Sequence, residues 1–187
     1  MAVKGDETRA RLIAATRTLV EAKGCHGAGL NEVLAVAGAP RGSLYHHFPG
    51  GKDQLVGEAL AAAGREVDVL LDELAGTAAT SRELVLGLLD ALVVRMVEAD
   101  YAKGCPVATV ALEVAASNET LRRVCDGIYT GWQRRLAEVL RTDGHVDADD
   151  LAATVLALIE GALVLARAGH TRLPVDRAAR HLAKLLA

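Results

Sequence analysis

Apolar residues recur three and four positions apart along most of the chain, and this spacing predicts amphipathic helices rather than strands. The first such segment, Asp6–Lys23, is followed by Gly24, which predicts a helix stop. A shorter segment, Leu30–Ala37, ends just before Gly38. Pro40 then stands where a new helix would begin, because proline is tolerated at the first helical positions.

Longer amphipathic segments follow, and most of them have a start signal of their own. Gly51 to about Leu74 predicts one long helix. Thr80, with Glu83 three residues later, predicts a capping box before a helix that runs to about Asp100. The remaining predicted helices are Pro106–Ala116, Glu119–Arg141 with Asn118 or Ser117 as cap, Ala148–Ala168 capped by Asp147, and a last helix from Pro174.

The composition agrees with an all-α fold. The chain has 187 residues, 51% of them hydrophobic and only four of them prolines, which is enough for one large domain or two small ones. Its net charge of −3 alone would argue against nucleic acid. However, residues 1–56 hold seven Lys/Arg against five Asp/Glu, whereas residues 57–187 hold fourteen against nineteen. A small basic head on an acidic body favours DNA contact at one end only.

The stretch Ala37–Phe48, A-G-A-P-R-G-S-L-Y-H-H-F, predicts the DNA-contacting element. Leu44 and Phe48 recur four apart on one apolar side of the predicted helix. The other side is polar, and such a short helix suits the major groove of B-DNA. A helix, a glycine-containing turn and a second short helix form the pattern of a helix-turn-helix, although an ordinary helical hairpin has the same outline.

The same residues carry a family resemblance. The run from Leu30 to Leu60, including A-G-A-P-R-G-S-L-Y-H-H-F-P-G-G-K-D-Q-L, resembles the DNA-binding domain of TetR-type transcriptional regulators. The residues of this run, together with G-C-P-V at Gly104–Val107, are similar to those of the LmrA/YxaF-like branch of the family. Many relatives have Ser or Thr at the position of Pro40. In this chain the hydroxyl that would cap the helix is therefore absent, and the helix begins with a rigid proline instead. The motif covers about the first third of the chain, and the rest matches only in helical layout and at Gly104–Val107.

The resemblance implies a helix-turn-helix domain over residues 1–50 and a helical effector-binding and dimerisation domain over residues 51–187. It also implies a repressor that binds a palindromic operator as a homodimer and is released by a small hydrophobic or aromatic effector. In the first domain, Gly42 lets the backbone approach DNA closely. Lys52, at the start of the second domain, neighbours helix N-terminal amides that suit phosphate. His47 is as readily a solvated bystander as a DNA contact. The expected DNA-binding residues are Arg41, Gly42, Ser43, Tyr45, His46 and Lys52.

The predicted helix Ala148–Ala168 is apolar nearly all round, which favours burial on two sides. It would be either the central helix of a bundle or, with the last helix, part of a dimer interface. The resemblance favours the dimer, and so does the short recognition helix, because a dimer doubles the DNA site. The expected interface residues are Leu158, Gly161, Leu165 and Leu182. A close helix–helix approach would justify Gly161, which costs about 1 kcal/mol relative to Ala in a helix.

Aromatic and sulfur side chains suit a flat apolar effector. The expected pocket residues are Met96, Tyr101, Cys105, Tyr129 and Trp132. Alternatively, Met96 and Trp132 simply fill the core. Cys105 directly precedes the helix that Pro106 begins, so a redox-sensing role is a second alternative.

Other function classes find little support in the sequence. There is no G-x-S-x-G, H-E-x-x-H or glycine-rich phosphate loop, so we expect no enzyme, cofactor or metal. The N-terminus lacks an apolar signal core, and no uninterrupted apolar run reaches about 20 residues, so we expect a cytoplasmic protein with reduced cysteines and no membrane partner. The runner-up class is a helical small-molecule-binding protein without DNA activity, which a mobility-shift assay would distinguish.

Overall fold

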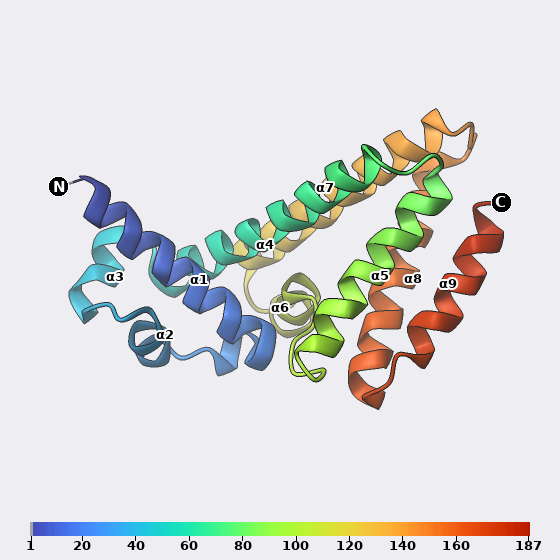
Figure 1. Ribbon diagram of the computed structural model, residues 1–187. Helices are drawn as coiled ribbons and strands as arrows, with labels where there is room; N and C mark the ends of the chain where they lie inside the picture. The colour runs from blue at the N-terminus through green and yellow to red at the C-terminus, as the bar shows by residue number, and fades with distance from the viewer. Residues whose placement is uncertain (1) are drawn as a thin grey trace. The chain divides into compact units, whose positions relative to one another are not determined.

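The computed structural model describes residues 2–187, with side chains from residue 5 onward; Met1, the first residue of the predicted 1–50 domain, lies outside this range. Within it the regular structure is nine α-helices and no strand, which confirms the predicted all-α class. The helices are α1 (Ala2–Gly27), α2 (Leu30–Ala37), α3 (Arg41–His47), α4 (Gly51–Ala75), α5 (Ser81–Glu98), α6 (Pro106–Val114), α7 (Glu119–Thr142), α8 (Ala148–Gly169) and α9 (Leu173–Leu185) (Figure 1).

Most helix ends lie where local capping signals predicted them. Gly38 closes α2 in the left-handed conformation, at φ 58° and ψ 37°, which a residue without a side chain adopts easily. Before α5, the Thr80 hydroxyl accepts the Glu83 N–H at 3.2 Å. Before α7, the Asn118 side chain accepts the Leu121 N–H at 3.0 Å. These contacts satisfy backbone donors that the first helical turn leaves unpaired.

Three predicted ends differ from the structure. Helix α1 begins at Ala2 and not at Asp6. Gly24 breaks α1 at φ 77° and ψ 176°, but helical residues resume after it and α1 continues to Gly27. Asp147 precedes α8 without capping it, because its side chain makes no capping hydrogen bond.

The chain divides into two compact units that differ from the predicted division after residue 50. The first unit comprises the chain up to Arg65 together with Pro106–Ile128. The second comprises Glu66–Cys105 and Tyr129–Ala187. Helices α4 and α7 therefore each contribute to both units, whereas α6 belongs to the first. The functional boundary between DNA binding and effector binding remains a prediction.

In the first unit α1 packs against α2, α3 and α6 (Figure 1). The core is made of fully buried apolar residues from these helices, from Phe48 directly after α3, and from the starts of α4 and α7. Gly57 and Gly64 let α4 lie close to Val124 and Ile128 of α7, since an added Cβ would come within 3.5 and 3.2 Å of those side chains. The largest buried side chains of this core are Leu12, Leu44, Phe48, Leu55, Leu60 and Leu121.

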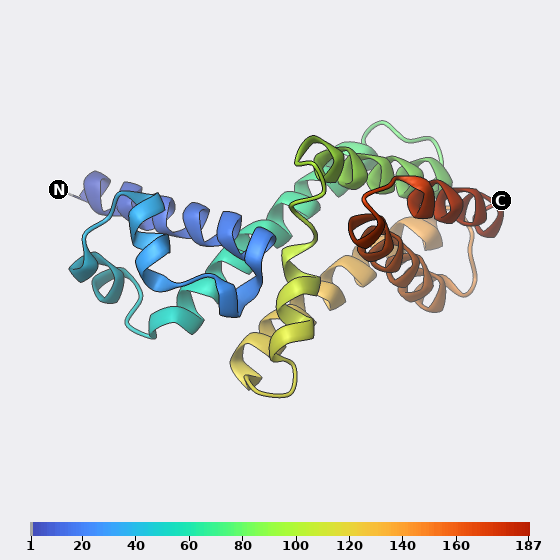
Figure 2. The ribbon, with the colours of Figure 1, turned by 90° about the horizontal axis from the view of Figure 1, so that it is seen from below.

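In the second unit α5, α8 and α9 lie side by side (Figures 1 and 2). Leu89, Ile159 and Leu182 are among its fully buried side chains. The start of α5 is tied to the end of α7, because the Ser81 N–H and hydroxyl both donate to Asp143 Oδ2, at 2.8 and 2.5 Å. These two hydrogen bonds lower the pKa of the Asp143 carboxyl.

Candidate nucleic-acid interface and effector site

The helix-turn-helix is formed by α2 and α3. The turn between them is closed by backbone bonds from Gly38 N–H to the Ala35 carbonyl at 3.2 Å and from Ala39 N–H to the Leu34 carbonyl at 3.0 Å. Pro40 is extended at φ −69° and ψ 151°, so α3 begins directly after it. Because Leu44 of α3 is buried in the first unit, the opposite side of this helix faces solvent.

The predicted DNA-contacting residues of α3 lie on that solvent side. Arg41, Gly42, Tyr45 and His46 are all exposed. An added Cβ on Gly42 would meet nothing within 4 Å, so the backbone here is open to a close approach. The Ser43 hydroxyl donates to the Pro40 carbonyl at 2.6 Å, which leaves its oxygen able to accept.

Lys52 lies in the first turn of α4, close to the end of α3. A Cβ on the neighbouring Gly51, which has φ 69°, would lie 3.9 Å from a Tyr45 ring carbon. Tyr45 is therefore next to the α4 N-terminus, whose free amides and positive dipole end favour phosphate. By contrast, His47 is half-buried: its ring makes an edge contact with Phe48, at 6.4 Å between centroids, and it is not a fully solvated bystander.

Three cations around this turn form no ion pair with a described residue, as is also true of Arg65 further along α4. Elsewhere in the first unit, Lys23 pairs with Glu32 at 2.5 Å, and Arg9 pairs with Glu58. Arg41 and Lys52 form no ion pair with a described residue. The same holds for Arg11, a residue that sequence reasoning missed: its guanidinium lies 3.6 Å from where a Gly38 Cβ would be.

A network around Gln54, also missed from the sequence, fixes the start of α4. Its Oε1 accepts the Gly50 N–H at 2.9 Å, and its Nε2 donates to Glu58 at 3.0 Å. Glu58 in turn holds Arg9 of α1, whose guanidinium lies 5.4 Å from the Phe48 ring centroid. The only available signal was the K-D-Q-L run, which shows the position of Gln54 but none of its partners.

Helix α6 is joined to α1 by its single charged residue, Glu113. Glu113 Oε2 accepts the His26 N–H at 2.9 Å and lies 3.0 Å from His26 Nδ1. A Cβ on Gly24 would lie only 1.6 Å from Glu113 Oε1. Glycine at the break in α1 therefore makes room for this carboxylate, which no local sequence signal indicates.

The five predicted effector residues all belong to the second unit, but the structure brings them into separate contacts. The rings of Tyr129 and Trp132 meet edge to face at 5.6 Å between centroids. Tyr101 instead contacts His170 at 5.4 Å, and the Cys105 thiol hydrogen-bonds to Glu160. Met96 and Trp132 are buried, as expected if they fill the core.

The other two cysteines, Cys25 and Cys125, are buried as well. Burial raises the pKa of both thiols, that of Cys125 to about 11.

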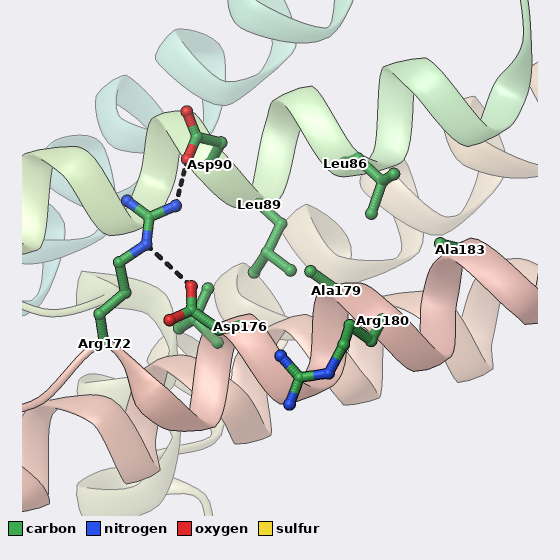
Figure 3. Close-up of a pocket in the computed structure, with 9 residues that line it drawn as sticks. Leu86, Leu89, Asp90, Arg172, Asp176, Ala179, Arg180 and Ala183 are labelled. Carbon is green, nitrogen blue, oxygen red and sulfur yellow. Dashed lines mark hydrogen bonds and ion pairs between the residues drawn. The ribbon is translucent and has the colours of Figure 1, made fainter.

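A pocket of about 280 Å³ lies between α5 and α9 (Figure 3). Arg172 at its edge hydrogen-bonds to both Asp90 and Asp176, and these bonds raise the pKa of its guanidinium. None of the five predicted effector residues lines this pocket. Its size is at the small end of ligand sites, which usually measure about 300–1,000 Å³. Its apolar and small lining residues are Leu86, Leu89, Val175, Ala179 and Ala183.

The structure separates the predicted dimer residues into two groups. Leu158 is 38% exposed and Leu165 is 62% exposed, and Gly161 between them has nothing within 4 Å of an added Cβ. This side of α8 is therefore uncovered within the described part of the protomer. Leu182 is 0% exposed, so its prediction as an interface residue is wrong. Its side chain is enclosed by the protomer's own helices and cannot reach a partner.

One helix, α8, is long and apolar enough to cross a membrane by length and composition alone. A core helix of a soluble protein passes the same test, and 44% of the apolar window in α8 is buried inside the protein.

Comparison with known proteins identifies the class of this molecule. Residues 12–59 match the model of the bacterial regulatory proteins of the TetR family, and residues 82–181 match the LmrA/YxaF-like C-terminal domain of transcriptional regulators. The chain therefore belongs to the TetR family of transcriptional regulators, in its LmrA/YxaF-like branch, as the sequence resemblance predicted.

Individual relatives agree over nearly the full length. An uncharacterized HTH-type transcriptional regulator of Mycobacterium tuberculosis H37Rv, Rv0196, is 32% identical over 95% of this chain and 93% of its own. LmrA of Bacillus subtilis is 30% identical over 90% of this chain and 91% of its own. The crystal structure of the regulatory protein TetR from Rhodobacter sphaeroides superimposes with a TM-score of 0.86 at 26% identity, over 95% of this chain and 98% of that one.

Membership of this family confirms several predictions. The protein is a DNA-binding transcriptional regulator and not an enzyme. Regulators of this family are soluble cytoplasmic proteins that usually form dimers and bind small-molecule effectors.

Proposed function

We propose that this protein is a repressor that binds a palindromic operator as a homodimer and leaves it when a small hydrophobic effector binds. The observation that carries this proposal is the exposed side of α3, where Arg41 and nearby Lys52 keep positive charges that no described carboxylate neutralises. DNA phosphates are the natural partners of such charges. The proposed location is the cytoplasm, where operator DNA is found.

Each of the predicted DNA-binding residues has a role that follows from its chemistry. Arg41 and Ser43 reach base edges or phosphates at the start of α3. Tyr45 offers its hydroxyl to phosphate beside the α4 N-terminus, where Lys52 adds a charge. Gly42 allows the backbone to come close to the DNA. His46, exposed at the end of α3, is a further phosphate contact.

The proposed dimer interface is the uncovered side of α8. Leu158, Gly161 and Leu165 recur three and four positions apart, so they lie on one stripe of the helix. Val164 is exposed beside them. Gly161 in the middle allows two copies of α8 to approach closely across a two-fold axis. In such a dimer the two α3 helices would be one DNA turn apart, about 34–36 Å, or a multiple of it.

The proposed effector site lies in the second unit, around Met96, Tyr101, Cys105, Tyr129 and Trp132. Its signal would reach the DNA-binding unit through α6, because Cys105 ends the second unit's first segment and α6 begins at the next residue. Glu113 at the other end of α6 holds α1 by its bonds to His26. A displacement of α6 would thus move α1 and alter the distance between the two DNA-binding units of the dimer.

A mobility-shift assay on the DNA upstream of the protein's own gene tests the repressor proposal. The wild type should form one sharp complex at low salt. Lys52→Ala should weaken this complex, whereas Lys23→Ala should not, because Lys23 is already paired with Glu32. A wild-type protein that ignores duplex DNA at low salt, or stays monomeric at micromolar concentration, would overturn the proposal.

Trp132 is the chain's only tryptophan, so its fluorescence reports directly on the proposed effector site. Titration with flavonoid-like or cationic aromatic compounds should quench this fluorescence and release operator DNA. Trp132→Leu should impair release more than DNA binding. An unchanged response in both Trp132→Leu and Tyr129→Leu would place the site elsewhere. If oxidation alone releases DNA and Cys105→Ser abolishes that release, a redox switch replaces the ligand.

A further inference from the structure

Glu160 is an acidic residue in an otherwise apolar part of α8, the run L-A-L-I-E-G-A-L-V-L. The Cys105 thiol hydrogen-bonds to its carboxylate. The carboxylate oxygen Oε2 is buried and has no hydrogen-bond partner among the described residues. A carboxylate oxygen can accept hydrogen bonds and a thiol is a weak donor, so the accepting capacity of Oε2 is unused within the described part of the protein.

This arrangement is unfavourable for the protein alone. Burial raises the pKa of the Glu160 carboxyl, because the charged form has lost its water, and the hydrogen bond from Cys105 opposes this rise. Native proteins leave few buried polar atoms without a partner, since each one costs stability. A leucine at this position would extend the apolar run without that cost. An unfavourable group kept inside a protein commonly serves function at the expense of stability.

The segment that leads to Cys105 is attached to α8 beside Glu160 and continues into α6, so a change at Glu160 can be passed on to α6. Asp100 and Tyr101 both have left-handed backbones, at φ 48° and 57°, which shape the segment that leads to Cys105. Arg167 of α8 donates to the Ala102 carbonyl at 3.0 Å. The segment is thus held to α8 at two places, through Arg167 and Glu160, and it continues directly into α6.

We propose that Oε2 of Glu160 accepts a hydrogen bond from the effector. The effector is therefore an apolar, aromatic compound that carries a donor group, either a hydroxyl or a protonated amine, rather than a pure hydrocarbon or ether. This inference rests on the proposed effector site in the second unit. The donor supplies the partner that the protein lacks, and its position beside Cys105 couples binding to the start of α6.

Three probes with the same ring body test the donor requirement: 2-naphthol, 2-naphthylmethylamine and 2-methoxynaphthalene, which lacks a donor. Calorimetry on the full-length wild type should show the two donor probes binding at least about tenfold tighter than the ether, since a hydrogen bond to a charged group contributes that much. Glu160→Leu should remove this preference. The matched control Glu138→Gln, at an exposed position of α7, should keep it.

A near-isosteric variant separates the two kinds of donor. Glu160→Gln keeps a carbonyl oxygen but loses the charge, so the hydroxyl probe should keep part of its preference over the ether, whereas the amine probe should lose all of it. Equal losses for the two probes would support acceptance by the charged carboxylate for both donors, whereas equal binding of all three probes to the wild type would overturn the inference.

Thermal unfolding of the ligand-free protein gives an independent result. If Glu160 is kept for a ligand, Glu160→Leu should raise Tm by about 2–4 °C, the shift expected when an unpaired buried group is replaced by an apolar one. A fall in Tm would show that Glu160 is structural and would overturn the inference. If all three probes bind equally and still release operator DNA, the effector proposal survives without Glu160. If no probe binds the wild type or releases DNA, both proposals fail.

Discussion

The groups without a partner that carry the two proposals differ in their surroundings: those of the first unit lie near the surface and that of the second lies in the interior. In the first unit Arg41 and Lys52 are unpaired cations at the surface, around α3 and the start of α4. In the second unit Glu160 has an unpartnered carboxylate oxygen in the interior. An unpaired charge at the surface costs little, because water solvates it, and it is available to a large anionic polymer. An unpaired acceptor inside is costly, and only a molecule small enough to enter can satisfy it.

The same contrast applies to apolar residues. In the first unit, Leu44 and Phe48 of the recognition element are buried and leave the polar side outside. In the second unit, α8 buries one side and leaves Leu158 and Leu165 exposed. The apolar pattern of the recognition element is complete within one chain, although Val36 and Leu112 elsewhere in the first unit are exposed. That of α8 is not, which is why a second copy of the chain is the proposed partner.

The largest effect is expected from the exposed stripe of α8. Leu158→Glu combined with Leu165→Glu should convert the dimer to a monomer and weaken operator binding by about 10²–10⁴-fold, because the two heads no longer bind as a linked pair. Sedimentation velocity and mobility shifts measure the two effects. Leu112→Glu is the control, since Leu112 is an exposed apolar residue of α6 outside the stripe. A double variant that remains dimeric would place the interface elsewhere.

Arg41→Ala tests whether the unpaired charge of α3 reads bases. If it does, operator affinity should fall by about 1–3 kcal/mol, and discrimination against substitutions at one position of each half-site should disappear. Binding to a panel of single-base operator variants measures this. A uniform decrease over the whole panel would instead make Arg41 a phosphate contact.

Glu113→Ala tests communication between the two units. Removal of the bonds to His26 should leave operator affinity nearly intact. It should lower the coupling free energy between effector binding and operator release by about 0.5–2 kcal/mol. Operator titrations with and without a saturating releasing compound measure the coupling. Glu138→Ala, an exposed change in α7, should leave it unchanged. Full release in Glu113→Ala would exclude this route.

The smallest effects are expected at the phosphate-binding residues. Lys52→Ala should weaken binding several-fold on all sequences and reduce the salt slope by about 0.9 for each phosphate that is no longer neutralised, or about 1.8 in the dimer. Tyr45→Phe should weaken binding to a similar extent without changing the slope, because it removes a hydroxyl and no charge. Affinities at four or more salt concentrations distinguish the two. A normal slope in Lys52→Ala would remove that residue from the interface.

Much of the first unit could be predicted from the sequence, because its determinants are local. Gly38 ends α2 in a left-handed turn, Leu44 and Phe48 lie one helical turn apart, and in the second unit Thr80 caps α5 through a residue three positions away. Such signals act over a few residues, so the helix-turn-helix, the helix ends and the exposed side of α3 follow from them. Because Leu44 faces the core, the residues on the opposite side of α3 point to solvent.

The remaining features depend on residues far apart in the sequence, and only the tertiary structure decided them. Leu158 of α8 and Leu182 of α9 are both leucines of amphipathic helices, yet one is exposed and the other is enclosed. The reason is that α9 packs against both α5 and α8, whereas one side of α8 is left uncovered. Glu113 meets His26 across 87 positions of the chain. Glu160 meets the Cys105 thiol from a distant part of the chain, and its Oε2 has no partner among the described residues. Helical periodicity places a side chain on a face, but the partner of that face is set by long-range packing.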